Sequence, residues 1–531
     1  MYVGDWLGKR ELLTPERLAL VDDVTGQRYT YRQLNQRANR LAHALRRQLA
    51  VRKGDRVAIL AKNCIEYLDA LFAVGKLGAI LVPLNWRLTI DELAYVLNDC
   101  TARVLITADE FAATAQALRA QASFEALVVL GERPIGGGLS FDLLVADASA
   151  APITEEVELD DPHLILYTSG TTGRPKGAIL PHRVLVWNSL NTNIGWELRA
   201  DDVSIVHTPL FHTGGINVLL IPLLHAGGTL VLMRDWEPQR CLELIERERV
   251  TVFFAVPTMF QMLLDAPRFA QTDFGSVRFF ISGGAPCPVP LIEAYQARGI
   301  SFRQGYGLTE VSVNCFTLNP EDAIRKVGSV GRPIFHLDAR LVDEQGQDAA
   351  DGAIGELWLR GPTVCAGYWN NLEATRAAIT DGWFHTGDLA RLDDEGYYYI
   401  VDRKKDMFIS GGENVYPAEV ERALYEHPAV AECAVIGVPD ARWGEVGCAL
   451  IVVRGDATLA DDDVLRHCRQ RLGRYKVPKH VLFMDELPHN SSGKVLKPLL
   501  REHFSRTAGA ASYEAADPLD GRAAAPPASA S

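Results

Sequence analysis

The chain has 531 residues, too many for a single hydrophobic core, so two or more domains are expected. Hydrophobic residues make up 48% and charged residues 23%, the balance of an ordinary globular protein. The net charge of −13 argues against nucleic acid or an anionic membrane as the main partner, so an anionic ligand must be met by local cations and backbone N–H groups.

The N-terminal segment and the cysteines indicate a cytoplasmic protein. MYVGDWLGKRELLTPERL carries charges and has no apolar core long enough for a signal peptide. No apolar run reaches the ~18 residues of a membrane span. The nine cysteines form no CxxC pair, so neither a disulfide framework nor a zinc site is predicted. We expect a monomer or homodimer whose partners are small molecules, with no nucleic acid and no membrane span.

Strands and helices alternate in the first half of the chain. A helix is expected over 65–74, and Thr89 and Glu92 form a capping box that opens another. The same alternation returns at 201–283, which predicts parallel sheets with right-handed crossovers in two related α/β halves. The expected strands are 55–60, 79–84, 103–108, 126–131, 203–210, 227–233, 250–256 and 277–283.

The sequence pattern changes from about residue 335. Short expected strands are divided there by Asp/Gly turns, which predicts a β-rich subdomain. Residues 415–505 predict a small α/β unit, and the Pro/Ala-rich end predicts disorder. The expected fold class is therefore α/β. It has a large domain of two doubly wound halves and a β-rich subdomain (1–402), a small α/β C-terminal domain (403–505) and a disordered tail (506–531).

The segment YTSGTTGRPKG, residues 167–177, predicts a phosphate-binding loop. Its glycines allow successive N–H groups to point into one concavity, its hydroxyls add donors and its lysine adds charge. It is not a Walker A loop, because Pro175 stands where that motif needs glycine. The loop residues expected to hold phosphate are Thr168, Ser169, Gly170, Thr171, Thr172, Gly173 and Lys176.

This loop resembles the phosphate loop of the AMP-forming adenylating enzymes, which include acyl-CoA synthetases, peptide-synthetase adenylation domains and luciferases. Four further blocks are similar to that superfamily in order and spacing: GYGLTE (305–310), GWFHTGD (382–388), DRKKDMFISGGENVYPAEVE (402–421) and PHNSSGK (488–494). The resemblance implies that a carboxylate attacks the α-phosphorus of ATP to give an acyl-adenylate. A thiol, usually that of coenzyme A, then displaces AMP.

The resemblance also implies roles in the first step. Lys494 would be the catalytic lysine between the carboxylate and the α-phosphate, to which Thr309 would donate. Glu310 would bind Mg2+, a cation that prefers oxygen ligands. The remaining residues assigned to the nucleotide are Gly284, Tyr306 (against adenine), Gly307, Asp388 (on the ribose hydroxyls) and Arg403.

For the second step, the resemblance implies that the small domain pivots at Lys405. One orientation would present Lys494, and the other would bring Gly411 and Gly412 to a pantetheine tunnel. Asn414 resembles a residue that closes on the adenylate. The residues assigned to the coenzyme A nucleotide are Arg87, Tyr475 and Lys479. Lys494 is also a candidate target of a lysine acetyltransferase and deacetylase, because acetylation would remove its charge.

The identity of the acid is constrained by the segment around His212, which the resemblance places beside the acyl site. No carboxylate follows His212 to pair with an amino group, so an amino acid is not expected. Val311 and Val313 indicate an apolar pocket. A medium- or long-chain fatty acid is favoured, while an aryl or arylpropenoic acid stays open, as do a luciferase-like oxygenase and a non-catalytic relative. The cofactors expected are ATP, Mg2+ and coenzyme A.

Overall fold

The computed structural model describes most of the chain. The described residues are 3–131, 137–153, 155–168, 174–285, 287–440, 442–455, 457–489 and 494–510. None of the helices in these ranges combines the length and the apolar character that a membrane crossing requires. The chain divides into two compact units, which we call the large unit (1–407 with 491–494) and the small unit (408–490 with 495–531).

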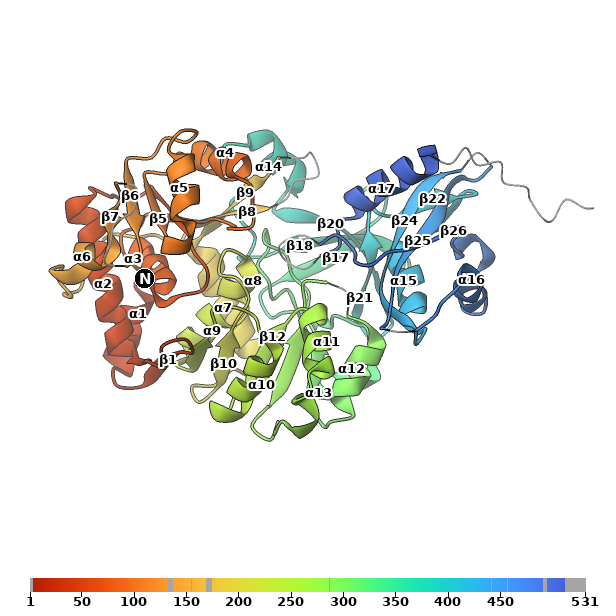
Figure 1. The fold of residues 1–531 in the computed structure, drawn as a ribbon, viewed down its shortest axis with the longest axis horizontal. Helices are drawn as coiled ribbons and strands as arrows, with labels where there is room; N and C mark the ends of the chain where they lie inside the picture. Colours follow the sequence, from red (N-terminus) through yellow and green to blue (C-terminus); the bar gives the residue numbers. More distant parts are fainter. Residues whose placement is uncertain are drawn as a thin grey trace, which may run out of the picture. The chain divides into compact units, whose positions relative to one another are not determined.

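The first half of the large unit is built on a seven-stranded sheet of order β7-β6-β5-β3-β4-β8-β9 (Figure 1). Its strands run parallel except the last, which pairs antiparallel with β8. The parallel sheet predicted from the alternating pattern is therefore present. Its strands are β3 (Arg56–Leu60), β4 (Ile80–Pro83), β5 (Val104–Thr107), β6 (Ala126–Val129), β7 (Leu139–Ser140), β8 (Pro162–Thr168) and β9 (Lys176–Pro181).

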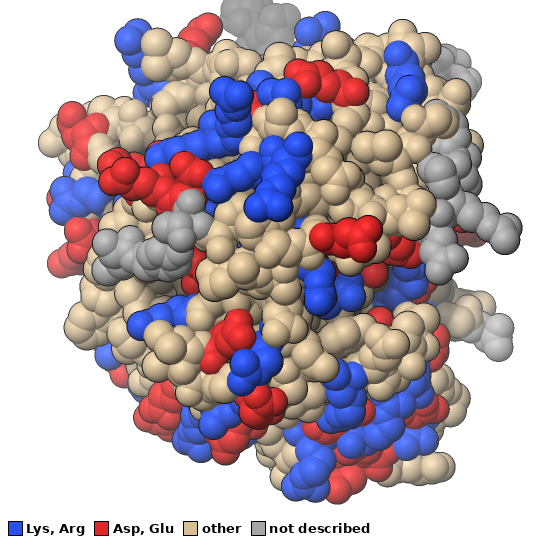
Figure 2. Space-filling view, turned by 90° about the vertical axis from the view of Figure 1, so that its left-hand side faces the viewer, with Lys and Arg blue, Asp and Glu red and all other residues tan. Residues whose placement is uncertain are grey.

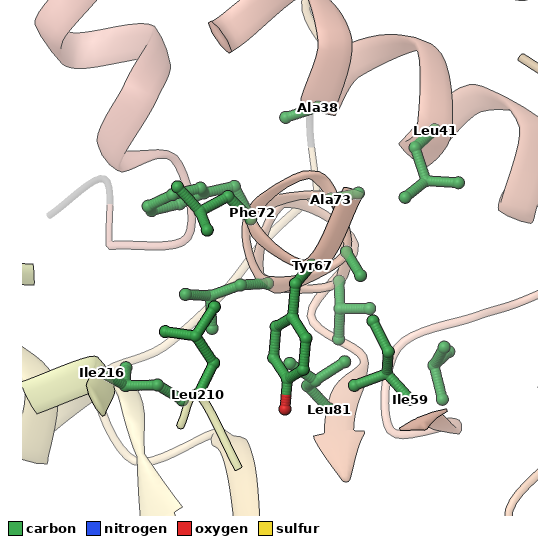
Figure 3. Close-up of a cluster of buried hydrophobic side chains, with 14 of the residues drawn as sticks. Ala38, Leu41, Ile59, Tyr67, Phe72, Ala73, Leu81, Leu210 and Ile216 are labelled. Atoms are coloured by element: carbon green, nitrogen blue, oxygen red, sulfur yellow. The ribbon is translucent and has the colours of Figure 1, made fainter. Parts of the chain in front are cut away.

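Helices pack on this sheet through apolar side chains. The predicted capping box is present, since the Thr89 hydroxyl accepts from the Glu92 backbone and the Glu92 side chain accepts from Thr89. Tyr67 points from α3 toward Leu81 and Leu210 in the core (Figure 3). The helices of this half are α1 (Trp6–Leu13), α2 (Tyr31–Gln48), α3 (Ile65–Lys76), α4 (Ile90–Cys100), η1 (Asp109–Phe111), α5 (Ala112–Leu118) and α6 (Phe141–Ala146).

The second half contains a sheet of order β10-β11-β1-β2 and a parallel sheet of order β12-β13-β14. The two adjoin, because the backbone N–H of Thr251 donates to the carbonyl of Val203 at 2.9 Å. Its strands are β1 (Leu18–Asp22), β2 (Arg28–Thr30), β10 (Val203–Val206), β11 (Thr229–Leu232), β12 (Val252–Ala255), β13 (Phe279–Ser282) and β14 (Phe302–Gln304). Its helices are α7 (His182–Gly195), α8 (Thr213–Asn217), α9 (Leu220–Ala226), α10 (Pro238–Arg247), α11 (Pro257–Asp265), η2 (Phe269–Gln271) and α12 (Val289–Gln296).

The β-rich subdomain predicted after residue 335 follows. Its main sheet has the order β17-β18-β20-β19, with β21 also paired to β20, and all of these pairs are antiparallel. The elements are β15 (Phe316–Thr317), α13 (Pro320–Arg325), β16 (Arg332–Pro333), β17 (Asp338–Val342), β18 (Ile354–Arg360), α14 (Leu372–Ala378), β19 (Ile379–Thr380), β20 (Trp383–Leu392) and β21 (Tyr398–Arg403).

The small unit has one five-stranded sheet, with β23-β22-β25-β24 in order and β26 parallel to β25. The chain from 506 to 510, where a disordered tail was predicted to start, is instead the end of a helix, and the tail from 511 onward lies outside the described residues. The elements are β22 (Phe408–Ser410), β23 (Glu413–Val415), α15 (Pro417–Tyr425), β24 (Val430–Asp440), β25 (Gly444–Val453), α16 (Asp461–Arg469), η3 (Arg474–Lys476), β26 (His480–Phe483) and α17 (Lys497–Ala510).

Charged side chains of both signs are interspersed on the face drawn in Figure 2. That face therefore offers no broad surface of one sign, although the chain carries a net charge of −13. An anion bound by this protein must be held by local groups.

Candidate active site

The predicted phosphate loop connects two antiparallel strands, β8 and β9. Thr168 and Lys176 end these strands and pair directly with each other. The Thr168 hydroxyl donates to the Lys176 carbonyl at 3.4 Å and lies 3.5 Å from Oε1 of Glu310. The loop residues between them, 169–173, were also predicted to hold phosphate and lie outside the described residues.

Glu310 lies at the end of this hairpin. The Tyr368 hydroxyl donates to its Oε1 at 3.0 Å, and the Lys176 ammonium lies over the Tyr368 ring, 5.4 Å from its centroid. Burial, followed by the Glu310 charge, raises the pKa of the Tyr368 phenol, which stays a neutral donor. The hairpin thus brings one carboxylate, two hydroxyls and one ammonium together.

This donor set fits a Mg2+ ion held mainly by substrate phosphates. No group of three or more His, Cys, Asp or Glu side chains capable of holding a metal occurs in the described part of the chain. Mg2+ in nucleotide enzymes is usually held by one or two carboxylates, waters and phosphate oxygens rather than by an all-protein cage. A single carboxylate, Glu310, beside the hairpin meets that requirement.

Asp388, Arg403 and Tyr306 form a second polar group. Asp388 and Arg403 are direct partners on β20 and β21, and Arg403 Nε forms an ion pair with Asp388 Oδ1 at 2.9 Å. The Tyr306 hydroxyl bonds the other oxygen, Oδ2. Burial, followed by the Asp388 charge, raises the pKa of the Tyr306 phenol. Asp388 is buried at 4% exposure, so its carboxylate is held in one orientation by two donors.

The GYGLTE block contains a tight turn that only glycine can enter. The backbone of Leu308 bridges to that of Ser312, and the turn between them carries Thr309 and Glu310. A Cβ on Gly307 would lie 2.1 Å from the Val313 carbonyl oxygen, which no side chain tolerates. Gly307, which was assigned to the nucleotide, therefore lies against the protein's own backbone.

Lys494 belongs to the large unit. Lys494 is an exposed residue, but the protein groups around its ammonium displace part of the water that would hydrate that charge. The pKa of Lys494 is therefore lowered, first by desolvation and then by the charge of Arg403, with Lys405 acting in the same direction. Asp388 and Glu310 raise it in part. The pKa of Lys494 therefore depends on charges of both polar groups, Asp388 and Arg403 in one and Glu310 in the other.

The acid site predicted near His212 coincides with a small cavity. His212 precedes α8 and packs against the Phe211 ring, with centroids 4.4 Å apart. The cavity is lined by Ile205, Val206, Thr208, Gly214, Gly215, Leu219, Leu220 and Phe254. Gly284 has φ +86°, and the Cβ of any replacement would lie 3.5 Å from Val256. The lining is almost entirely apolar.

The residues assigned to coenzyme A fall in both units. In the small unit, Gly411 has φ +60° and donates its N–H to the Trp443 carbonyl at 2.9 Å. Lys479 Nζ pairs with Asp440 at 2.8 Å, so this lysine has a protein partner that the sequence did not indicate. The remaining assigned residues of this unit are Gly412 (φ +90°), Asn414 in β23 and the exposed Tyr475 in η3.

Arg87 lies in the large unit. Its Cζ is 4.6 Å from the Trp86 centroid and 5.8 Å from that of Phe211. Burial lowers the pKa of its guanidinium. The contact places Arg87 close to the aromatic ring next to His212, a proximity that could not be read from the sequence.

Several residues of the site had no signal in the sequence. Tyr368 on Glu310, Phe254 in the cavity wall and Trp443 beside Gly411 are aromatic residues in ordinary apolar or turn segments. Their positions depend on long-range contacts, and only the folded chain reveals them.

Comparisons with known proteins show the family to which the chain belongs. Residues 10–369 match the model of a family described as AMP-binding enzyme, and residues 419–494 match its C-terminal domain. A feruloyl-CoA synthase of an Amycolatopsis species is 44% identical over 94% of this chain and 99% of its own. The long-chain-fatty-acid–CoA ligase FadD13 of Mycobacterium tuberculosis is 39% identical over 95% of this chain and 99% of its own.

Among solved structures, ATP-bound MatB from Rhodopseudomonas palustris superposes with a TM-score of 0.87 at 36% identity. The match covers 95% of this chain and 99% of that one. These findings confirm the resemblance to adenylating enzymes and the predicted fold class, a larger N-terminal and a smaller C-terminal α/β domain.

Proposed function

The chain belongs to the AMP-binding enzyme family, and from that premise we propose that it joins a carboxylic acid to coenzyme A through an acyl-adenylate. The observation that carries the proposal is the pair of polar groups in the large unit, one around Glu310 and one around Asp388, with Lys494 sensing both. They combine a nucleotide-binding carboxylate, a metal-binding carboxylate and a catalytic cation.

In the first step, a carboxylate oxygen attacks the α-phosphorus of ATP, and the bond to pyrophosphate breaks. The reaction brings two anions together, so positive charge must be placed where the transition state is most negative. Lys494 supplies that charge, and Thr309 donates to the α-phosphate. The loop from Thr168 to Lys176 holds the β- and γ-phosphates.

Asp388 accepts the ribose hydroxyls in this proposal. Its Oδ2 already accepts from Tyr306, and its Oδ1 is ion-paired with Arg403. Each carboxylate oxygen has a second lone pair, so both can accept again from a vicinal diol. The protein donors therefore fix the carboxylate in advance, while the Tyr306 ring offers a flat face to adenine.

Glu310 would hold Mg2+ together with the phosphate oxygens of ATP. The ion would supply charge neutralisation on the departing pyrophosphate. Tyr368 and Thr168 keep the Glu310 carboxylate oriented toward the hairpin that carries the phosphates.

In the second step, the thiol of coenzyme A attacks the acyl carbon and AMP leaves. We assign the pantetheine arm to Gly411 and Gly412, and the nucleotide end to Arg87, Tyr475 and Lys479. The change of orientation at Lys405 stays part of this proposal. Lys405 lies in the turn just before the boundary between the two units.

The acid is apolar along most of its length, because the cavity beside His212 is lined by aliphatic residues and Phe254. The fatty acid favoured from the sequence is supported by relatives such as the long-chain-fatty-acid–CoA ligase at 39% identity. An aryl or arylpropenoic acid has the support of a relative at 44% identity. We therefore propose an aryl or arylpropenoic acid first and a fatty acid second.

Acylation of Lys494 is a proposed control of the same site. The lowered pKa of its ammonium raises the fraction of neutral amine, the form that attacks an acyl donor. Acetylation would remove the charge that the first step needs. Protein acetylated at Lys494 should lose ATP–pyrophosphate exchange and regain it on deacetylation; unchanged exchange would contradict both the control and the assigned role.

The test of the proposed function is ATP–pyrophosphate exchange with a panel of aryl, arylpropenoic and fatty acids, followed by thioester analysis with coenzyme A. We expect acid-dependent exchange and, with coenzyme A, an acyl-CoA of the mass of the acid. If acids support exchange but the product is light or an oxidised compound and no thioester forms, a luciferase-like oxygenase would be favoured. No exchange with any acid would contradict the function.

A further inference from the structure

Arg303 is a buried charged group whose role the activation chemistry leaves unexplained. It lies on β14 with only 8% of its surface exposed. Its Cζ lies 4.4 Å from the centroid of the Phe279 ring, but its buried Nε has no hydrogen-bond partner. Within the described residues, the guanidinium forms no ion pair with a carboxylate.

Two other cations of the large unit, one buried and one partly exposed, are paired. Lys76, at 2% exposure, bonds both Asp5 and Asn35. Arg278, a neighbour of Arg303 along the sheet, bonds both oxygens of Asp202 at 2.6 and 2.8 Å. A buried cation without an acceptor is costly, so an acceptor supplied from outside the chain is the simplest way to satisfy it.

The guanidinium stays charged at neutral pH. Burial, followed by the charge of Arg278, lowers the pKa of Arg303 to about 10, and Glu197 and Glu321 oppose that shift from a distance. Neither acidic residue forms an ion pair with it within the described chain. Arg303 therefore keeps its buried Nε–H as a donor for which the described chain supplies no acceptor.

Arg303 shares a sheet face with the wall of the acid cavity. On β13, Ile281 is the direct partner of both Phe254 on β12 and Arg303 on β14. Directly paired residues of a sheet point to the same face. Phe254 lines the cavity, and Ile281 packs in one cluster with Leu219, which lines it too.

The guanidinium also lies away from the end of the sheet where the acid is activated. It reaches Phe279, which comes two residues before Ile281 on the parallel strand β13. Gly305 and Tyr306 follow Arg303 in the opposite direction, and two extended residues span roughly 7 Å. A carboxylate activated beside Tyr306 would therefore direct the far end of its acid toward Arg303.

We propose that Arg303 determines specificity by donating N–H bonds to an oxygen at the end of the acid remote from its carboxylate. The substrate class is then an apolar acid that carries a hydroxyl, an ether oxygen or a second carboxylate at that end. This inference rests on the proposed acid activation and refines its substrate.

The experiment compares matched acids that differ only in the distal oxygen. The pairs are cinnamate with 4-hydroxycinnamate and octanoate with octanedioate, assayed by ATP–pyrophosphate exchange with wild-type protein and Arg303→Met. Hydrogen bonds to a charged group correspond to about 10- to 150-fold in kcat/KM. We expect wild type to prefer an oxygenated acid of at least one pair by that factor, and Arg303→Met to lose the preference. The acid without the oxygen should change by no more than about threefold, because it offers no acceptor to Arg303 and so loses no specific interaction in the variant.

The matched control is Arg298→Met. Arg298 is exposed and also lies over aromatic rings, with its Cζ 5.3 Å from the Phe269 centroid and 5.8 Å from that of Phe274. Unlike Arg303, it lies in a turn and not on the strands that carry Phe254 and Ile281. This variant should leave every acid unchanged. Arg303→Lys should recover part of the preference, since it keeps charge but not the planar fork.

The outcomes separate this inference from the function beneath it. Exchange with acids but no preference in either pair would overturn the role of Arg303 and leave acid activation standing. An equal loss on both acids of a pair would show that Arg303 only supports the fold, and would also overturn it. Exchange with no acid would instead contradict the proposed function. If Arg303→Met fails to fold, two measurements on wild-type protein test the inference instead. They are the kcat/KM preference for the oxygenated acid of a pair, and a larger rise in unfolding temperature with that acid than with its partner.

Discussion

Two regions of the large unit treat buried charge in opposite ways. Around Asp388, both carboxylate oxygens have protein partners, an ion pair with Arg403 and a hydrogen bond from Tyr306. On the face of β14, Arg303 is buried with no carboxylate partner in the described chain. In the proposed function, the first region binds the nucleotide, which is the same for every acid. The second has a donor whose acceptor must come with the acid.

The comparison predicts that changes in the first region affect all acids alike, whereas changes in the second depend on the acid. Each prediction below tests one side of that difference, and they run from the largest expected effect to the smallest.

Lys494→Ala should give the largest loss. Removing one preorganised donor of transition-state charge typically costs ~10²–10³ in rate. We expect ATP–pyrophosphate exchange to fall by that factor for every acid, while thioester formation from supplied acyl-adenylate is largely kept. An equal loss in both half-reactions, or a loss that varies with the acid, would contradict the assignment.

Gly411→Leu should affect the second half-reaction instead. Its φ of +60° is unfavourable for leucine, and the new Cβ would lie 2.8 Å from the Trp443 ring. We expect thioester formation to fall by about 100-fold, as misplaced reacting groups do, with adenylation unchanged. The control is Gly455→Leu, which also has positive φ but nothing within 4 Å. Normal coenzyme A turnover in Gly411→Leu would make Gly411 a simple turn residue.

Gly214→Ala tests the acid side. An added Cβ would contact Thr208 at 3.7 Å and Phe254 at 3.8 Å, ordinary distances that the fold tolerates but that take space from the cavity. We expect kcat/KM for a bulky aryl acid to fall about tenfold, as overpacking does, and that for acetate or propionate to stay the same. A uniform change over all acids would show that the cavity does not hold the acyl group.

Tyr368→Phe tests the region proposed to bind Mg-ATP, and we expect a smaller effect on activity than in the variants above. It removes the 3.0 Å hydrogen bond to Glu310 while keeping the ring beneath Lys176. Loss of one such hydrogen bond corresponds to about a fivefold change in affinity. We expect KM for Mg-ATP to rise by that factor, equally with every acid. Titration of exchange activity against Mg2+ checks it, and an unchanged Mg2+ dependence would remove Tyr368 from the metal site.

The pH dependence of adenylation should show the lowered pKa of Lys494. The ammonium is the active form, so activity is full below this pKa and declines as the pH rises through it. Because the pKa is lowered from 10.5, the alkaline decline should begin below that of an ordinary lysine. Lys494→Arg should move or abolish this limb in the exchange assay. An identical limb in the variant would assign it to another group.

The residues that the sequence assigned to the nucleotide lie together in the fold around Asp388 and Glu310, and this grouping has a physical reason. Phosphate and ribose require fixed donor geometry, and short blocks such as YTSGTTGRPKG encode it within a few residues. The pairing of Asp388 with Arg403 follows from two neighbouring strands, and both residues lie within such blocks. Their partner Tyr306 lies in a third.

The acid region depends on contacts between distant segments, which no local pattern reveals. Leu18–Asp22 pairs with Thr229–Leu232, and nothing in either segment indicates its partner. Arg303 looks like any strand arginine in the sequence. Its significance comes from burial against Phe279 without a carboxylate, which only the folded sheet shows.

The central claim is that the acid is activated by attack on the α-phosphorus of ATP. The direct measurement uses a substrate acid with both carboxylate oxygens labelled with 18O, in the complete reaction with coenzyme A, followed by mass spectrometry of the nucleotide and phosphate products. The account predicts one 18O atom in AMP and none in pyrophosphate. Label in inorganic phosphate with ADP as the nucleotide product, or unlabelled AMP, would contradict it.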